Sequence, residues 1–289
     1  MKIGLIDVDS HNFPNLALMK ISAWHKQQGD EVEFYSPWFD YDRVYVSKIF
    51  TFTQDYQYCI RANEVVQGGT GYDLQNKLPD CIEHIYPDYD LYNIKNTAYG
   101  FMTRGCPRGC SFCIVAEKEG KCSNKVADLS EFWRGQKEIK LMDPNLLAYK
   151  EWKQLLQQLI DSKAWVDITQ GLDIRCMTDE KAEIINKLKV KMIHFAWDNY
   201  ELKTYEKLKL FRPIFNLDER KLRVYVLVNY NTTLEQDLER IYKLRELKYD
   251  PYVMIYEKWK ASKQIKKLQR WVNNKFIWRT CDKFEDYIA

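Results

Sequence analysis

Short apolar runs and amphipathic segments follow one another from residue 98 to the C-terminal end of the chain. The apolar runs, typical of buried strands, lie at 98–103, 139–142, 165–169, 192–197, 222–228 and 252–256. The clearest of the helices between them places Leu234, Leu238 and Ile241 on one face. It begins with Thr233 and Gln236 in the pattern of a capping box. Strands and helices that alternate in this way are typical of parallel βαβ units.

Six such strands fit a barrel-like sheet that does not close. The segment 96–289 is shorter than the ~250 residues typical of a complete eightfold barrel. We therefore predict an α/β fold with a partial (β/α)6 TIM-like barrel. In folds of this kind the reactive groups lie on the loops that follow the carboxyl ends of the strands.

Residues 1–95 follow a different pattern, with fewer helices. The predicted elements are a strand over 3–6, a helix over 14–27, and strands over 31–35, within 43–52 and over 64–66. Gly29 ends the helix, and the glycine-rich turn 68–71 is suited to close backbone approach. This pattern predicts a small Rossmann-like α/β domain over 1–95, with the partial barrel and a basic C-terminal helix over 96–289.

Composition narrows the class of protein without choosing a substrate. Charged residues make up 29%, hydrophobic residues 46%, and the net charge of +3 is too small to require a nucleic-acid partner. The first apolar run stops at Ile6 and Asp7 follows, which is not the pattern of a signal peptide. No apolar stretch approaches the ~18 residues of a membrane span. We expect a cytoplasmic protein whose eight cysteines bind metal or are buried thiols.

Three cysteines follow the first barrel strand at the spacing C-x₃-C-x₂-C. They are Cys106, Cys110 and Cys113, and Gly105 and Gly109 allow the backbone between them to fold tightly. Thiolates on one loop can each ligate an iron of a cubane cluster. Because a cubane has four irons, three ligands leave one iron open to a non-protein ligand, as in catalytic metal sites.

Two other metal sites compete with this interpretation. A structural zinc site needs a fourth Cys or His, for which Cys122 is the nearby candidate. An electron-transfer ferredoxin uses four cysteines for each cluster. The three-cysteine pattern favours the open iron–sulfur cluster over both.

The cysteine motif resembles the C-x₃-C-x-Φ-C motif of the radical S-adenosylmethionine superfamily, with Phe112 in the aromatic position. The resemblance covers about residues 97–280. It implies that Cys106, Cys110 and Cys113 hold a [4Fe–4S] cluster, and that the methionyl amine and carboxylate of S-adenosylmethionine bind the fourth iron. It also implies that an electron from an external one-electron reductant breaks a carbon–sulfur bond. The product is then a 5′-deoxyadenosyl radical, which abstracts hydrogen.

Further cofactor-binding residues are expected after the second, third and fourth barrel strands, where the family binds S-adenosylmethionine. They are Asp143, Asn145, Gln170, Asp173, Arg175 and Asp198. Asp143 and Asn145 stand where the family usually has a Gly-Gly-Glu-like turn. Each of the six could instead be a cap or part of a loop salt bridge. For Arg175 a functional role is favoured, because an unpaired charge behind a buried strand would be costly.

The segment 3–35 resembles the cobalamin-binding domain that precedes the barrel in one large subgroup of these enzymes. The likeness lies in 14–19, in 29–34 and in the turn 68–71. A cobalamin-ligand motif D-x-H-x-x-G is nearly present at Asp9 and His11, but Pro14 replaces its glycine. Because the segment is short, a degenerate substrate or docking domain is favoured over cobalamin binding. His11 is interpreted as a turn residue and not as a cobalt ligand.

Methylthiotransferases of the same superfamily share the Thr-Arg-Gly-Cys approach to the motif. They carry three further cluster cysteines in the N-terminal domain, whereas this chain has Cys59 and Cys81 there. No additional C-terminal RNA-binding domain is recognisable either, so methylthiolation is not expected. Cys122, Cys176 and Cys281 are interpreted as buried thiols.

The segment from Lys258 to Arg279 has eight basic residues, no acidic residue and four interleaved aromatic residues. This composition is typical of a nucleic-acid-binding surface. The same helix carries an apolar stripe at Ile265, Leu268 and Val272, so its lysines could equally be a solvated face. If RNA binds there, replacing the lysines at 263, 266 and 267 weakens binding and flattens its salt dependence.

The sequence predicts an enzyme that cleaves S-adenosylmethionine reductively to modify a substrate, which could be a small molecule, a peptide or an RNA. It does not assign a catalytic residue beyond the cofactor ligands. One alternative is a non-catalytic iron–sulfur or S-adenosylmethionine-binding regulatory protein, favoured by the altered turn at 142–145. Another is a cobalamin-dependent radical methyltransferase.

Overall fold

The computed structural model describes residues 1–11 and 13–288. The chain divides into two compact units, Met1–Ile139 and Lys140–Ala289. The division falls within strand β8 (Glu138–Leu141). No helix in the described part of the chain is long and apolar enough to cross a membrane.

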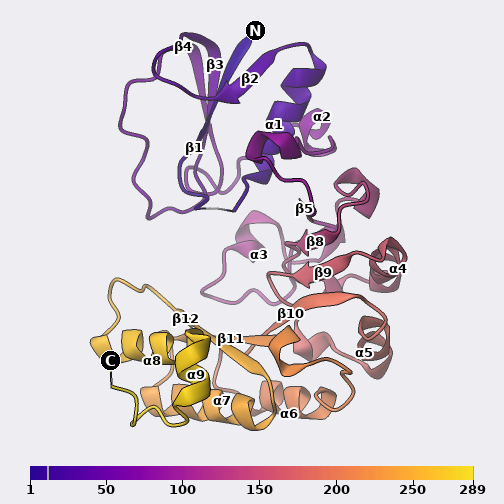
Figure 1. The fold of residues 1–289 in the computed structure, drawn as a ribbon, viewed down its shortest axis with the longest axis vertical. Helices are drawn as coiled ribbons and strands as arrows, with labels where there is room; N and C mark the ends of the chain where they lie inside the picture. Colours follow the sequence, from indigo (N-terminus) through magenta and orange to yellow (C-terminus); the bar gives the residue numbers. More distant parts are fainter. Residues whose placement is uncertain (12, 289) are drawn as a thin grey trace. The chain divides into compact units, whose positions relative to one another are not determined.

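The first unit contains a sheet of four parallel strands in the order β2-β1-β3-β4 (Figure 1). Its strands are β1 (Lys2–Asp7), β2 (Glu31–Phe34), β3 (Tyr41–Ser47) and β4 (Ala62–Gly68). Helix α1 (Leu16–Gln27) joins β1 to β2 and begins at Asn15, whose side chain accepts from the Leu18 N–H at 3.2 Å. The predicted strands and helix of this segment are confirmed.

The two faces of this sheet are covered by different kinds of side chain. On one face, Leu18 and Ile21 of α1 pack against Ile3 and Leu5. On the other, Ile6, Tyr41, Val44 and Val46 pack against partly buried residues from loops rather than helices, among them Tyr35, Tyr56 and Tyr72. Aromatic side chains from connecting segments therefore stand where a larger α/β domain would have helices.

The remainder of the first unit consists of short elements. They are α2 (Asp80–Glu83), η1 (Tyr89–Tyr92), β5 (Thr97–Gly100), β6 (Thr103–Arg104), α3 (Val115–Lys118), β7 (Asn124–Lys125) and η2 (Leu129–Glu131). The prediction of a single strand at 98–103 is thus wrong, because this segment contains parts of two strands, β5 and β6. Gly100 ends β5 where a Cβ would lie 2.4 Å from the Phe132 ring, and β6 pairs with β7 in an antiparallel hairpin instead of continuing β5.

The larger sheet has the strand order β12-β11-β10-β9-β8-β5, so that its strands follow chain order, while β6 and β7 form a separate hairpin. The strands beyond β8 are β9 (Trp165–Ile168), β10 (Val190–Ala196), β11 (Leu222–Val228) and β12 (Asp250–Ile255), and they pair in parallel. This confirms the predicted alternation of parallel strands and helices. The apolar run predicted at 222–228 coincides with β11.

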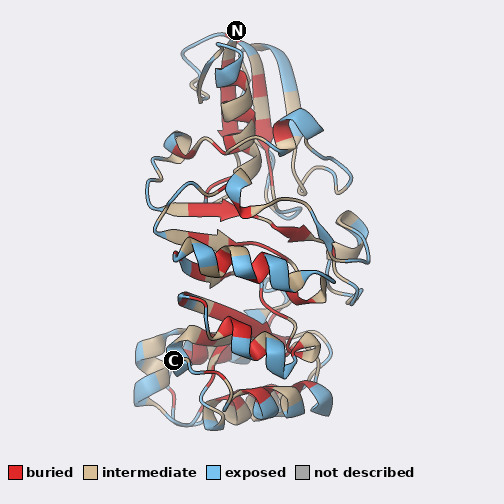
Figure 2. Cartoon of the chain, turned by 90° about the vertical axis from the view of Figure 1, so that its right-hand side faces the viewer, coloured by how far each residue is buried: buried red, intermediate tan, exposed pale blue. Residues whose placement is uncertain are grey.

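Helices connect successive strands of the second unit, and further helices follow its last strand, β12. They are α4 (Trp152–Ser162), α5 (Asp179–Ile185), α6 (Leu202–Phe211), α7 (Leu234–Glu246), α8 (Lys263–Asn273) and α9 (Lys275–Thr280), with the short turns η3 (Leu146–Ala148), η4 (Ile174–Cys176) and η5 (Glu219–Lys221). The predicted capping box is confirmed, since Thr233 and Gln236 bond each other's backbone N–H groups. In Figure 2 the helices show buried and exposed stripes, as amphipathic helices on a sheet do.

The two faces of this sheet differ in polarity, because side chains alternate along each strand. Val224 and Val226 of β11 are fully buried, and α7 packs against β11 and β12. The alternate residues Arg223 and Tyr225 are only partly buried. The face away from the apolar core is therefore polar.

The predicted domains, 1–95 and 96–289, are not tested by these divisions. The two larger sheets separate between Gly68 and Thr97, whereas the compact units separate between Ile139 and Lys140. Where the functional domains divide stays a prediction.

Candidate functional site

The three motif cysteines lie in a loop, residues 105–123, that the pairing of β6 with β7 closes at its base. We call it the cysteine loop. The Glu119 carboxylate accepts from the Arg104 guanidinium at 2.8 Å and from the Gly105 N–H at 3.1 Å. The end of α3 is thereby tied to the strand that leads into the motif.

Glycine is required where the cysteine loop begins. Gly105 has φ +87°, and a Cβ there would lie 2.1 Å from the Cys122 carbonyl oxygen. The next residue, Cys106, donates its N–H to the Gly120 carbonyl at 3.1 Å. The Cys113 N–H donates to the Cys110 carbonyl at 2.9 Å, which places these two cysteines on one turn. The predicted tight folding of this loop is confirmed at Gly105.

The donor types of the loop fit an iron–sulfur cluster. Cys106 and Cys110 are partly buried, Cys113 is exposed, and Phe112 between them is partly buried. Thiolates are the ligands that such clusters prefer. Over residues 1–11 and 13–288, His, Cys, Asp and Glu side chains form no group of three arranged to hold a metal ion. The fit therefore rests on the donor set and the closed backbone of the loop.

The glycine-rich turn 68–71 lies beside the cysteine loop within the first unit. The Lys118 ammonium of α3 donates to the Thr70 hydroxyl, and burial lowers the pKa of Lys118. A Cβ on Gly69 would lie 2.3 Å from the Lys48 carbonyl oxygen. The close approach predicted for this turn is thus made to the chain's own backbone.

In the second unit, the loops after β9 and β10 bring together three charged side chains: the predicted site residues Asp173 and Arg175, and Glu201. Arg175 Nε lies 2.8 Å from Asp173 Oδ1, and Arg175 Nη1 lies 3.3 Å from Glu201 Oε1. Asp173 also accepts from the Arg175 N–H at 3.0 Å as the cap of η4. Arg175, which was expected to need a ligand, thus has two carboxylate partners within the protein. The structure shows Asp173 as a helix cap and Arg175 in salt bridges. A role of either residue in binding a cofactor stays a prediction.

The other residues predicted after the strands differ in exposure. Asp143 and Asn145 are 0% and 1% exposed, whereas Gln170 is exposed. Ahead of Gln170, the backbone N–H and the hydroxyl of Thr169 both donate to the Leu141 carbonyl, at 2.9 and 2.8 Å. The loops after β8 and β9 are therefore fixed to each other just before the predicted residues begin.

A buried arginine that the sequence reasoning missed holds the loops after β10 and β11. Arg240 of α7 is 0% exposed, and donates to the carbonyls of Trp197, Asp198 and Leu227 and to the Asp237 carboxylate. The signal was present in the sequence, because residues 237 and 240 fall on the apolar stripe of the predicted helix. Charged residues on such a stripe are seldom fully buried unless they are paired.

The acidity of Asp198, another of the predicted site residues, is changed by its burial. Burial raises its pKa to about 6, although Arg240 and Arg175 act in the opposite direction. At neutral pH the ionised carboxylate is thus held in an unfavourable environment. Groups in this condition are found frequently at functional sites.

Replacing Asp198 by asparagine is expected to stabilise the cluster-free chain at pH 8 but not at pH 4. Between pH 3.8, the ordinary pKa of an aspartate, and about pH 6, the Asp198 carboxyl keeps its proton in the native state and loses it in the unfolded state. Stability therefore falls as pH rises through this window, by an amount on the order of 1–3 kcal/mol. Urea unfolding of D198N and wild type at both pH values measures it. D282N, at a carboxylate 91% exposed, is the control; an equal effect of D198N at both pH values would contradict the prediction.

Three aromatic rings form a row across the polar face of the larger sheet, and the sequence analysis did not identify them. His194 stacks on Tyr225 at 4.9 Å between ring centroids, and Tyr225 meets Tyr252 edge-on at 5.9 Å. Burial lowers the pKa of His194 to about 4, so its ring is neutral at pH 7. His194 Nδ1 lies 2.8 Å from the Ile168 carbonyl and must donate to it, which leaves Nε2 as an acceptor. The sequence did contain a sign of this row, because His194, Tyr225 and Tyr252 are each a polar aromatic residue within a predicted apolar strand.

Comparison with known proteins gives two similar sequences. The chain is 30% identical over 104 residues to a CDK5RAP1-like protein of Oryza sativa subsp. japonica, covering 33% of this chain and 17% of that protein. It is 27% identical over 205 residues to a tRNA-2-methylthio-N(6)-dimethylallyladenosine synthase of Protochlamydia amoebophila, covering 58% and 44%. The chain thus spans less than half the length of these relatives. No protein-family model matches the sequence.

Among solved structures, the chain is similar to Streptococcus suis SuiB bound to its precursor peptide SuiA. The TM-score is 0.46 at 13% identity, over 66% of this chain and 49% of that one.

The cysteine motif and the two sequence relatives indicate the same superfamily. The motif has the spacing and the aromatic Phe112 of the superfamily it resembles, and the similarity to the Protochlamydia amoebophila protein extends over 58% of the chain. By its cysteine motif and these two relatives, the chain is similar to radical S-adenosylmethionine enzymes, which use a [4Fe–4S] cluster and S-adenosylmethionine.

Proposed function

We propose that this chain holds a [4Fe–4S] cluster with Cys106, Cys110 and Cys113 and cleaves S-adenosylmethionine reductively to modify a substrate. The observation that carries the proposal is the cysteine loop, in which a glycine-dependent backbone carries three thiols and is closed at its base. When bound, the cluster supplies the electron that breaks a carbon–sulfur bond of S-adenosylmethionine. The six strands in sequential order support a partial (β/α)6 barrel as the framework.

The chain's own residues would bind and orient S-adenosylmethionine. Phe112 would pack beside the cluster ligands, and Gln170 is exposed for contact with the ribose. Arg175 would turn from Glu201 to the methionyl carboxylate, since its contact with Glu201, at 3.3 Å, is longer than that with Asp173. Because Asp143 and Asn145 are buried, they would act through the backbone of their turn.

Anaerobic incubation with dithionite and S-adenosylmethionine tests the proposal. We expect 5′-deoxyadenosine and methionine in equal amounts from the reconstituted protein. Failure to form 5′-deoxyadenosine with any reductant would instead support the non-catalytic, regulatory alternative. Corrin absorbance in protein purified anaerobically would support the cobalamin-dependent methyltransferase.

A second candidate function is methylthiolation of an RNA base, which the name of the bacterial relative suggests. Such enzymes resemble this chain but need a second cluster held by three further cysteines. Cys59 and Cys81 are the cysteines of the N-terminal segment, and both are exposed. The two functions differ in the amount of iron that the chain binds.

We expect about four irons per chain, because three cysteines suffice for one open [4Fe–4S] cluster. Changing Cys59 and Cys81 together to serine should leave this value unchanged. Iron and sulfide analysis of the anaerobically reconstituted protein measures it. About eight irons per chain, falling to about four in the double variant, would favour methylthiolation.

An RNA substrate has support from helix α8. Lys263, Lys266 and Arg270 are exposed, whereas Leu268 and Trp271 on the opposite face are 0% exposed. This confirms the predicted apolar stripe at Leu268. Lys267, in contrast, lies over the rings of Phe284 and Tyr287 and packs against the protein. The side chains exposed for contact with RNA are thus Lys263, Lys266 and Arg270, whereas the sequence predicted the lysines at 263, 266 and 267.

Changing Lys263, Lys266 and Arg270 to alanine should weaken binding of a tRNA pool and reduce its salt dependence. Each lost phosphate contact lowers the slope of log K against log[salt] by roughly 0.7–0.9. Fluorescence anisotropy at several salt concentrations measures the slope. Alanine at the exposed Lys150, Lys187 and Lys209 is the matched control. Equal slopes in both triple variants would leave α8 as a solvated face.

A further inference from the structure

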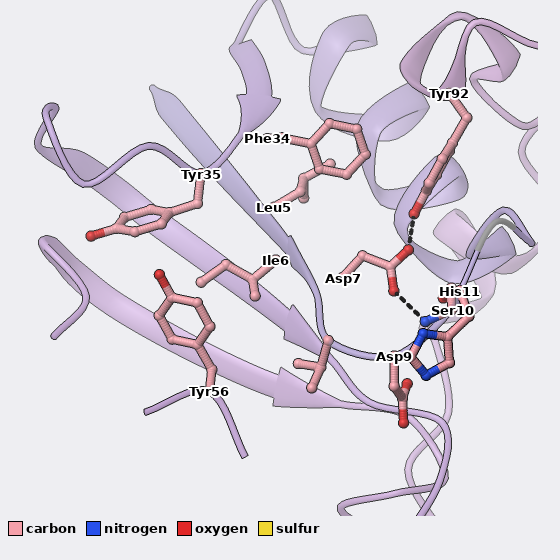
Figure 3. Close-up of a pocket in the computed structure, with 11 residues that line it drawn as sticks. Leu5, Ile6, Asp7, Asp9, Ser10, His11, Phe34, Tyr35, Tyr56 and Tyr92 are labelled. Atoms are coloured by element: carbon pink, nitrogen blue, oxygen red, sulfur yellow. Dashed lines mark hydrogen bonds between the residues drawn. The ribbon is translucent and has the colours of Figure 1, made fainter. Parts of the chain in front are cut away.

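A cavity of about 540 Å³ lies at the carboxyl ends of β1 and β2, wholly within the first unit (Figure 3). It is lined by Leu5, Ile6, Asp7, Val8, Asp9, Ser10, His11, Phe34, Tyr35, Tyr56 and Tyr92. The carboxyl edge of a parallel sheet is where α/β domains commonly bind ligands. The volume is within the range of small-molecule sites. Neither the cysteine loop nor the predicted cofactor residues line this cavity.

The polar groups of the cavity include one carboxylate that faces it. Asp7 accepts from the Tyr92 hydroxyl at 2.6 Å and from the Ser10 N–H at 3.2 Å, and these contacts fix its position. Asp9 has another task. It is 1% exposed and accepts from the backbone N–H groups that follow β3, at 2.8 and 2.9 Å. Asp7 is therefore the carboxylate that can meet a ligand.

Four aromatic rings line the cavity in two pairs. Phe34 and Tyr92 meet edge-on at 5.2 Å between centroids, and Tyr35 and Tyr56 do so at 6.3 Å. Figure 3 shows the first pair beside Asp7 and the second at the other end of the cavity. Ring faces attract cations, and aromatic groups with a nearby carboxylate are typical of sites for ammonium groups.

The lining also argues against other ligand classes. None of the eleven described residues is Lys or Arg, so a phosphate would meet Asp7 without a compensating fixed cation. The cavity volume of about 540 Å³ is also small for a ligand as large as a corrin.

We propose that this cavity binds an organic cation: a small molecule or side chain whose ammonium group lies against Asp7, beside Phe34 and Tyr92. The Asp7 carboxylate attracts the charge, and the hydrocarbon of the ligand packs on Phe34, Tyr35 and Tyr56. The proposal does not depend on the cluster or on cleavage of S-adenosylmethionine.

Choline and its neutral isostere 3,3-dimethylbutan-1-ol are the probes that test this. They have nearly the same shape, and the full-length protein is titrated with each in ligand-observed NMR, without reductant or S-adenosylmethionine. We expect choline to bind at least roughly tenfold more tightly than the alcohol. Equal binding of the two, or no binding of choline, would overturn the proposal.

Variants separate the cavity from the rest of the surface. D7N should reduce choline binding roughly tenfold and leave binding of the alcohol unchanged. Because D7N could disturb the contact with Tyr92, F34L serves as a second variant, and it should weaken choline binding too. Y58L is the matched control, since Tyr58 is 76% exposed and does not line the cavity. Choline binding that survives both D7N and F34L would contradict the assignment.

Discussion

Serine in place of Cys106, Cys110 and Cys113 is expected to remove the bound iron and abolish formation of 5′-deoxyadenosine. A serine hydroxyl is a far weaker ligand for iron than a thiolate, and the three cysteines are the proposed protein ligands of the cluster. The loop itself should persist, because its closure depends on backbone groups, Glu119 and the β6–β7 pairing. Iron analysis, visible absorbance and anaerobic turnover with S-adenosylmethionine measure the loss.

Cys122 provides the matched control for this experiment, because it lies in the same loop and is exposed, so that its interpretation as a buried thiol was wrong. C122S should keep its iron and its activity. Loss of metal in C122S would indicate a site with four cysteine ligands, as in structural zinc or ferredoxin sites. Retention of iron in the triple serine variant would contradict the proposed ligand set altogether.

The strands of both sheets were predictable because buried parallel strands are apolar runs bounded by polar turns. β11 and its neighbour α7 show this best, since the run at 222–228 and the capping box at Thr233 are found where the sequence places them. The break between β5 and β6 was not predictable. It depends on Phe132, whose ring approaches Gly100 from more than thirty residues along the chain.

The candidate site was predictable in its residue types but not in its contacts. Arg175 looked like a charge in need of a ligand, yet Asp173 and Glu201 lie beside it. The clamp made by Arg240 and the neutral His194 depend on carbonyl groups of other strands, which no local pattern reveals. Local spacing therefore identifies donor groups, whereas their partners follow from the tertiary fold.

Alanine at Gly105 is expected to lower iron content several-fold, although it changes no ligand. Its φ of +87° costs an L-residue on the order of 1–2 kcal/mol. In addition, the new Cβ would lie 2.1 Å from the Cys122 carbonyl oxygen, so the backbone of the cysteine loop must move. That movement would separate the Gly105 N–H from Glu119, and with it the start of the motif from α3.

Gly120 is the matched control, because it also has a positive φ, +93°, but nothing lies within 4 Å of a Cβ there. G120A should show the conformational cost alone and keep most of its iron. Iron per chain after identical reconstitution, together with thermal unfolding of the cluster-free chains, separates the two effects. Equal iron content in G105A and G120A would show that the close approach to Cys122 does not matter for the cluster. A selective loss in G105A would show that the closed backbone around the three cysteines is itself a requirement for holding the cluster.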